Sequence, residues 1–244
     1  MTENALRQLY EDPATQLSSG IERARRQAGI LARIVAASDR SLRCVDIGCG
    51  DGMAMSVAAA ACADLTDRSL DIVGFDWSVA ASRRAVARGL AVAQASLAAP
   101  GLPLANESVD IVIMSEIIEH LVDTDAALRE AWRVLVPGGS LLLSTPNLAA
   151  WYNRILLALG VQPLFTEVSL RAIHGRPGTA VVGHLRAFTL RAVVGLLQAC
   201  SFVDLEVSGA PYHDVPWPFG PLDRLRCRIP SMASILLVSA RRPD

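Results

Sequence analysis

The sequence predicts an α/β protein with a Rossmann-like, doubly wound and mostly parallel sheet. Short apolar runs alternate with stretches of helical period along most of the 244 residues. Such alternation is typical of parallel strands covered by helices on both faces. A glycine-rich turn, GCGDG at 48–52, directly follows the first apolar run. In these sheets ligands bind beyond the carboxyl ends of the strands, so the turn marks a candidate binding site.

The elements follow in order. The first helix is expected at 21–37, with Ile21, Ala24, Ala28, Leu31 and Val35 on one stripe and arginines on the other. The expected strands are 43–48, 71–76, 91–97, 109–116, 140–146, 202–209 and 234–241. The intervening helices are expected at 53–63, 79–88, 123–135 and 189–200, with Pro137-Gly138-Gly139 ending the third. The segment 147–188 breaks the alternation, and its length predicts an inserted cap.

Composition excludes several classes of protein. The net charge is −1 and all 23 basic residues are arginines, so no Schiff-base or Walker lysine exists and no general nucleic-acid binder is indicated. The five scattered cysteines form no CxxC pair, which favours reduced thiols and a cytoplasmic location. No apolar tract is long enough to predict a membrane span. No DxH or HExxH ligand set occurs, so we expect no metal.

The glycine turn leaves two nucleotide classes to weigh. Dinucleotides favour G-x-G-x-x-G with an acidic residue about 20 positions on. Here Met53 takes the place of the third dinucleotide glycine, and Asp76 lies 30 positions after Asp46. Each detail argues weakly against a dinucleotide, and a nucleotide-linked oxidoreductase stays as an alternative.

Four segments together resemble the class I S-adenosylmethionine-dependent methyltransferases. They are VDIGCGDG, GFDWS, VDIVIMSEIIEHL and LREAWRVLVPGGSLLLSTPN, in that order between Cys44 and Asn147. The closest likeness is to small-molecule enzymes of quinone biosynthesis and natural-product pathways. The resemblance implies one domain whose seven-stranded sheet has its last strand antiparallel. We expect a helical lid at 1–40, a cofactor-binding core at 41–147, a cap insertion at 148–188 and the end of the sheet at 189–244.

The resemblance also implies roles at the ends of the first two strands. Asp46 would organise the glycine loop and meet the ammonium group of S-adenosylmethionine, directly or through water. Asp76 would accept hydrogen bonds from both ribose hydroxyls, which suits a carboxylate. The loop positions expected to contact the cofactor are Gly48, Cys49, Gly50 and Gly52. The Cys49 side chain is interpreted as a small filler rather than a nucleophile.

Further cofactor contacts are implied after the other strands. Trp77 would pack on the adenine face. Ser96 and Leu97 would flank the adenine edge, although the family often has an aspartate at the place of Ser96. Ser115 and Glu116 would line the methionine end. The product left in this site would be S-adenosylhomocysteine.

The sequence indicates fewer candidate residues for binding the methyl acceptor than for binding the cofactor. Methyl transfer needs the nucleophile and the methyl group close and collinear, and it needs a base only for a protonated nucleophile. His120 and His184 are the candidate bases, ahead of His174 and His213, although a structural role is an open alternative for each.

Other features bear on the acceptor. The cap arginines 154, 171, 176 and 186 could bind an anionic acceptor or simply form a solvated face. The segment 210–221 could wall an apolar acceptor pocket or simply cover the core. We expect transfer to a hydroxyl oxygen of a small molecule by a monomer or homodimer. Transfer to nitrogen or carbon is an alternative, and so is a cofactor-binding module without catalysis.

Overall fold

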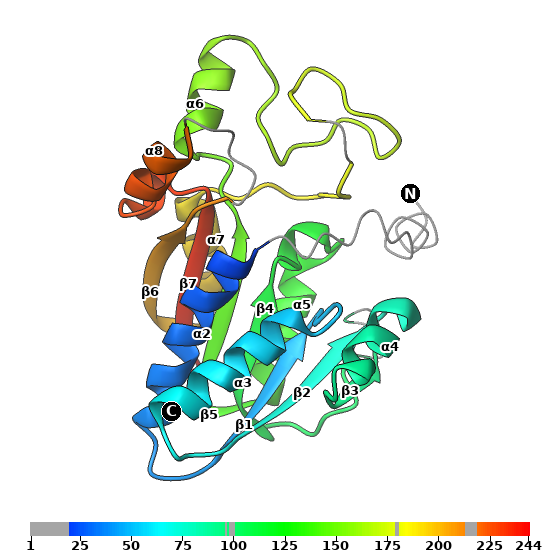
Figure 1. Cartoon of the computed structure of the whole chain (residues 1–244), viewed down its shortest axis with the longest axis vertical. Coiled ribbons are helices and arrows are strands. Elements are labelled where there is room, and N and C mark those ends of the chain that lie inside the picture. The colour runs from blue at the N-terminus through cyan, green and yellow to red at the C-terminus, as the bar shows by residue number, and fades with distance from the viewer. Residues whose placement is uncertain (1–19, 96, 98–100, 179–180, 213–218) are drawn as a thin grey trace.

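The computed structural model describes residues 20–95, 97, 101–178, 181–212 and 219–244, and its centre is a seven-stranded sheet (Figure 1). The strand order is β3-β2-β1-β4-β5-β7-β6, and only β7 pairs antiparallel to its neighbours among these strands. The strands are β1 Leu42–Ile47, β2 Leu70–Asp76, β3 Val92–Gln94, β4 Val109–Ser115, β5 Leu135–Pro146, β6 Val203–Ala210 and β7 Ile235–Arg241. The predicted fold class and the antiparallel last strand are therefore confirmed.

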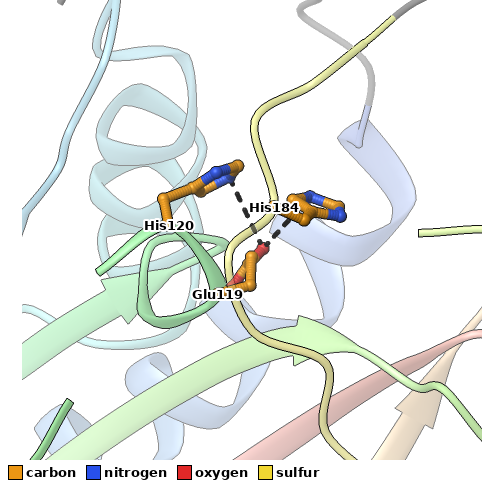
Figure 2. A group of neighbouring side chains, drawn as sticks. All are labelled: Glu119, His120 and His184. Carbon is orange, nitrogen blue, oxygen red and sulfur yellow. Dashed lines mark ion pairs between the residues drawn. The ribbon is translucent and has the colours of Figure 1, made fainter. Parts of the chain in front are cut away.

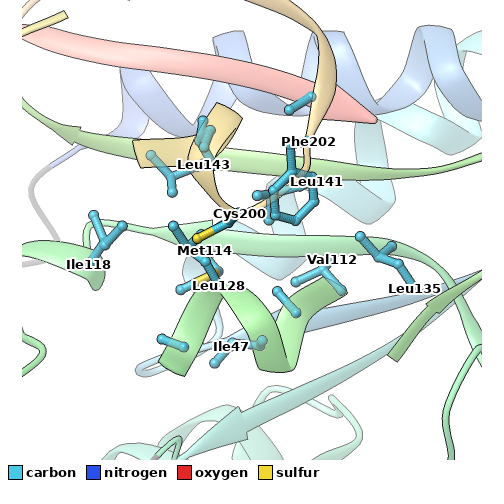
Figure 3. Close-up of a cluster of buried hydrophobic side chains, with 14 of the residues drawn as sticks. Ile47, Val112, Met114, Ile118, Leu128, Leu135, Leu141, Leu143, Cys200 and Phe202 are labelled. Atoms are coloured by element: carbon cyan, nitrogen blue, oxygen red, sulfur yellow. The ribbon is translucent and has the colours of Figure 1, made fainter. Parts of the chain in front are cut away.

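Helices cover both faces of this sheet. The described helices are α2 Ile21–Ala36, α3 Met53–Leu65, α4 Val79–Ala87, α5 Thr124–Val134, α6 Trp151–Ala158, α7 Leu190–Ala199 and α8 Phe219–Arg226, with short 3-10 turns η1 Ile118–His120 and η2 Pro230–Met232. A hydrophobic core lies on each face of the sheet. Because successive side chains of a strand point to opposite faces, β4 contributes residues to both cores. Val112 and Met114 pack with α5 and α7, while Ile111 and Ile113 pack with α2 and α3. Figure 3 shows the first of these cores.

Two details of the first helix differ from the prediction. Ala24, Ala28, Leu31 and Val35 form the buried stripe as expected, but Ile21 is 42% exposed. Arg23, expected on the polar face, is only 8% exposed. Its Nη1 lies 3.5 Å from Ser144 Oγ of β5 and 3.4 Å from Gln27 Oε1, so buried acceptors account for the inward position of the guanidinium.

The sequence predicts that Pro137-Gly138-Gly139 ends a helix, and this prediction is wrong. α5 ends at Val134 and β5 begins directly at Leu135, so residues 137–139 lie inside the strand. The register of β4 against β5 shifts between Val109 and Ile111 at this point. The glycines thus accommodate an irregularity in a strand pair, a common use of glycine within a sheet.

The segment after β5 lies beyond the end of the sheet, at the top of Figure 1. It contains α6, a helix that the periodicity did not predict, followed by irregular chain that returns to α7. α8 was missed as well. Trp151 of α6 donates through Nε1 to Asp223 of α8 at 2.8 Å, and Asp223 is fully buried. No helix in the described part of the chain has the length and apolar character to cross a bilayer.

Candidate active site

The glycine loop bends away from the sheet at the end of β1. Gly48, Gly50 and Gly52 all have positive φ angles, of 73°, 57° and 77°. The N–H groups of Gly48 and Cys49 both donate to the carbonyl oxygen of Phe75, at 2.7 and 3.1 Å, which fixes the loop to β2. A side chain at Gly48 would collide with Ile117. At Gly50 an added Cβ would meet no atom within 4 Å, so this backbone faces open space.

Asp76 ends β2 and holds the loop from the other side. Its Oδ2 accepts from the N–H of Gly50 and its Oδ1 from the N–H of Ser78, both at 2.8 Å. Only 8% of the residue is exposed. Each carboxylate oxygen can accept more than one hydrogen bond, so the group can shape the loop and still receive hydroxyls of a ligand.

Asp46 is the second-last residue of β1, two positions before the first glycine of this loop, and is 2% exposed. Its Oδ1 has no hydrogen-bond partner among the described residues. Burial raises the pKa of Asp46 to about 7, and Arg23 only partly opposes this. The carboxylate lines a cavity of about 10 Å³ with Gln27 and Ser115, and that volume suits about one water molecule. A cationic ligand group close to Asp46 would offset the cost of its burial.

β4 ends in a second group of polar side chains. Ser115 donates through Oγ to Gln27 Oε1 at 2.7 Å. Glu116 has a φ of 54°, a conformation that costs about 1–3 kcal/mol outside glycine and often occurs at functional sites. Its carboxylate accepts from Ser144 Oγ at 2.9 Å, and burial raises the pKa of Glu116.

The remaining candidate cofactor residues lie in different surroundings. Trp77 follows β2 directly and is half-buried, with its carbonyl oxygen accepting from Gln94 Nε2 at 3.1 Å. Leu97 packs against the core under α5. Ser96 lies outside the described residues. The side chain of the loop residue Cys49 packs against Gly74, and burial raises the pKa of its thiol. Both observations agree with a small space-filling side chain.

The two candidate histidines lie together. The ring centroids of His120 and His184 are 4.7 Å apart, and both Nε2 atoms face Oε1 of Glu119, at 3.9 and 4.0 Å (Figure 2). Burial and the neighbouring His184 lower the pKa of His120 to about 3, and burial lowers the pKa of His184. Burial and the nearby Glu116 raise the pKa of Glu119 well above its ordinary value.

Glu119 is the site residue that the sequence analysis missed. It is 1% exposed, and its position three residues after Glu116 in SEIIEH was the available signal. We expected no metal because no local ligand motif occurs. The three ligand atoms of Glu119, His120 and His184 lie within 4.8 Å of one another, so a spacing argument alone does not exclude a metal.

Aromatic side chains flank this cluster. Phe165 lies 6.1 Å from the ring of His184 and 4.9 Å from the ring of Tyr212, which belongs to the expected wall at 210–221. Residues 213–218, including His213, lie outside the described residues, and His174 is exposed.

Three of the four cap arginines have protein partners for their side chains. Arg176 pairs with the buried Glu167 at 3.2 Å. Arg154 and Arg186 donate to backbone carbonyls. These contacts reduce the support for binding of an anionic acceptor by the cap.

A family model described as a methyltransferase domain matches residues 20–207. The chain belongs to the class I S-adenosylmethionine-dependent methyltransferases. It is 33% identical over 146 residues to a ubiquinone biosynthesis O-methyltransferase of Parvibaculum lavamentivorans, a match covering 58% of this chain and 54% of the relative. The chain thus spans about half the length of that curated relative.

Solved structures share the fold of this methyltransferase. A possible histamine N-methyltransferase of Thermotoga maritima is 18% identical, with a TM-score of 0.59 and coverage of 97% of this chain and 99% of that one. The [4+2]-cyclase SpnF is 19% identical, with a TM-score of 0.58 and coverage of 93% and 84%. At such identities the likeness concerns the fold alone.

The loop of this methyltransferase fits S-adenosylmethionine, the cofactor of the family. Gly50 leaves room for a ligand against bare backbone, and Asp46 has an unpartnered buried oxygen suited to the cofactor's ammonium group. Asp76 retains acceptor capacity for ribose hydroxyls. When bound, the cofactor supplies an electrophilic methyl group on a sulfonium.

Proposed function

We propose that this methyltransferase transfers the methyl group of S-adenosylmethionine to a hydroxyl oxygen of a small-molecule acceptor. The observation that carries the proposal is the Glu119–His120–His184 cluster. Glu119 and His120 lie three and four residues beyond the candidate cofactor residue Glu116, and His184 joins them from the cap. A proton-accepting cluster beside the methyl donor is what a hydroxyl acceptor requires. The similarity to a ubiquinone biosynthesis O-methyltransferase supports the same proposal.

The cluster would act on the acceptor's proton. Both histidines are neutral near pH 7, because their pKa values are lowered by burial. One of them would take the hydroxyl proton as the oxygen attacks the methyl carbon. Glu119, about 4 Å from both Nε2 atoms, would stabilise the imidazolium that forms. Phe165 and Tyr212 support an acceptor with an apolar ring or chain beside its hydroxyl.

The cap completes this proposal. Leu185 and Arg186 donate from their backbone N–H groups to the carbonyl oxygen of Glu119, at 2.8 and 2.9 Å. We therefore propose that residues 148–188 cover the acceptor. Residues 1–19 of the expected lid at 1–40 lie outside the described residues. Within the described part, the hydrophobic stripe of α2 packs in the core, and we propose that the turn around Arg23 and Gln27 contributes to a lid.

Composition and cysteine chemistry bear on the class of acceptor and on the cellular location. A net charge of −1 and the two buried histidines favour a small acceptor over nucleic acid. The five cysteines are free and buried thiols, which supports a working place in the reducing cytoplasm. We propose a monomer or homodimer.

The test is acceptor-dependent transfer from cofactor labelled in its methyl group. Phenolic and alcoholic acceptors are compared with amines of matched size, and NMR of the product locates the label. Labelled methyl on oxygen supports the proposal, and label found only on nitrogen or carbon contradicts it.

A second candidate is a cofactor-binding module without methyl transfer. The cyclase SpnF shares this fold under a name that denotes other chemistry, so the fold alone does not decide. Tight binding of S-adenosylhomocysteine with no labelled product from any acceptor class would favour this candidate.

A further inference from the structure

Three ligand atoms converge just after β4, and they come from two distant parts of the chain. Glu119 and His120 belong to η1, whereas His184 lies near the end of the cap (Figure 2). Oε1 of Glu119 and one ring nitrogen of each histidine lie within 4.8 Å of one another. We propose that Glu119, His120 and His184 form a binding site for one divalent transition-metal cation.

The orientation of both rings is fixed by backbone carbonyls. Nδ1 of His120 lies 3.1 Å from the carbonyl oxygen of Gly183, and Nδ1 of His184 lies 3.1 Å from that of Phe165. A carbonyl oxygen only accepts, so each Nδ1 carries the proton. Each neutral ring then presents the lone pair of Nε2 toward Glu119. Metal-binding histidines are commonly oriented in this way, with the second nitrogen donating to a carbonyl or carboxylate.

The carboxylate completes a set of electron-pair donors. Oε2 of Glu119 accepts from Thr145 Oγ1 at 3.0 Å, while Oε1 has no hydrogen-bond partner among the described residues. Its separations of 3.9 and 4.0 Å from the two Nε2 atoms exceed hydrogen-bond range. A buried carboxylate oxygen without a hydrogen-bond partner is unfavourable unless a positive charge lies beside it. A cation bound to all three atoms removes this cost.

The spacing suits a metal after a small contraction. Bonds of about 2.0–2.2 Å to nitrogen and oxygen place tetrahedral ligands about 3.4 Å apart. The two separations of about 4 Å between Glu119 and the histidines therefore need to close by about half an ångström. The two histidine nitrogens, which lie within 4.8 Å of each other, need to approach by up to about 1.4 Å. Rotation of the glutamate and imidazole side chains can supply such a movement without a change in the backbone.

The backbone around the site is already organised. The carbonyl oxygen of Glu119 accepts from the N–H groups of Leu185 and Arg186, which joins η1 to the segment that carries His184. The buried carboxylate of Glu167 accepts from the N–H groups of residues 182–184, at 2.7 to 3.1 Å. The ligands are thus held together before an ion binds, as a high-affinity site requires.

The donor set selects the class of ion. Two imidazoles and one carboxylate suit Zn²⁺, Co²⁺, Fe²⁺ or Mn²⁺, whereas Mg²⁺ and Ca²⁺ prefer oxygen ligands throughout. Three protein ligands also leave coordination positions for water or a ligand oxygen, as in catalytic metal sites.

The use of the ion rests on the proposed function. An acceptor hydroxyl in the open position would have a lowered pKa and would release its proton to water. The new O–CH₃ bond then forms as the S–CH₃ bond breaks, and the sulfonium becomes a neutral thioether. With the ion bound, both histidines are ligands, and water takes over the role of base that one of them would have in the metal-free cluster.

The experiment measures the ion directly, without cofactor or acceptor. The full chain is stripped with a chelator, then titrated by calorimetry with Zn²⁺ and with Mg²⁺, and the Co²⁺-loaded protein is examined by visible absorption. The site predicts one Zn²⁺ per chain, a Co²⁺ spectrum with nitrogen ligation, and Mg²⁺ binding at least about tenfold weaker. Failure of the wild-type chain to bind any of these ions stoichiometrically would overturn the proposal.

Matched variants test the ligands. Glu119→Gln, His120→Gln and His184→Gln should each weaken Zn²⁺ binding by about 10- to 100-fold or more. His174→Gln, at an exposed cap histidine, should bind Zn²⁺ as the wild type does. Circular dichroism identifies any variant that fails to fold, and the wild-type titration decides the matter even then. Unchanged Zn²⁺ affinity in a folded Glu119 variant would exclude this site.

An assay of methyl transfer distinguishes failure of the metal-site proposal from failure of the proposed function on which its use rests. Zn²⁺ binding that is lost in the three ligand variants supports the site even if no acceptor is ever methylated. Chelator-resistant methyl transfer to oxygen by a chain that binds no metal would overturn the site and leave the proposed function intact.

Discussion

Replacing Gly50 with alanine should separate cofactor binding from stability. Gly50 has a φ of 57°, and a Cβ there meets no protein atom within 4 Å. The folded chain therefore loses only the backbone cost of a left-handed alanine, about 1–2 kcal/mol, partly offset by a less flexible unfolded chain. The same methyl group would project into the space where the cofactor is expected to pass.

The size of the binding effect follows from overpacking. An extra methyl group in a well-packed contact costs about 1–3 kcal/mol. This corresponds to about a 5- to 150-fold increase in the dissociation constant of S-adenosylhomocysteine.

Gly160→Ala is the matched control. Gly160 follows α6 in the cap, has a φ of 71°, is exposed and also has nothing within 4 Å of an added Cβ. Both variants should lose similar unfolding free energy in urea, but only Gly50→Ala should lose affinity in calorimetry. Equal affinity of wild type and Gly50→Ala, with both variants folded, would refute the placement of the cofactor against this loop.

Three further predictions concern buried carboxylates. Asp76→Ala should weaken S-adenosylhomocysteine binding by about 1.5–3 kcal/mol in calorimetry; because the change also removes the acceptor of the Gly50 N–H, an unaltered affinity would be strong contrary evidence. The raised pKa of Asp46 means that the folded state holds more protons than the unfolded state between about pH 4 and pH 7. Without cofactor, stability should therefore fall as pH rises through this window, and Asp46→Asn should be the more stable protein at pH 8, by up to about 4 kcal/mol, in urea unfolding at several pH values. Trp151→Phe removes one donor to the buried Asp223 and should cost about 1.5–3 kcal/mol of unfolding free energy, with Leu157→Ala on the exposed face of α6 as a near-neutral control.

The sheet and the loop could be predicted because their signals are local. Buried parallel strands are continuous apolar runs, and positive φ angles at 48, 50 and 52 require glycine or a similarly permissive residue. The strand ends at Asp46 and Asp76 then follow from the runs themselves. The sequence did not indicate that Asp76 also accepts from the Gly50 N–H, since that contact depends on how the loop folds back on β2.

The acceptor side could be predicted only in part. His120 and His184 were candidates as single residues, but the approach of His184 to Glu119 and His120 depends on docking of the cap through the carbonyl oxygen of Glu119. No sequence spacing encodes such a contact. Arg23 illustrates the same limit, because helical periodicity assigns a charged residue to solvent unless buried partners such as Ser144 are known.

The most direct test of the central claim is transfer of isotopically labelled methyl from S-adenosylmethionine by the purified chain. Hydroxyl-bearing aromatic acceptors are incubated with the labelled cofactor, and products and S-adenosylhomocysteine are quantified together by mass spectrometry. The account predicts labelled O-methyl product in equal amount to S-adenosylhomocysteine. At subsaturating cofactor, both should fall by about 5- to 150-fold in Gly50→Ala but not in Gly160→Ala. Binding of S-adenosylhomocysteine without labelled product from any acceptor, or equal turnover by Gly50→Ala and the wild type, would contradict it.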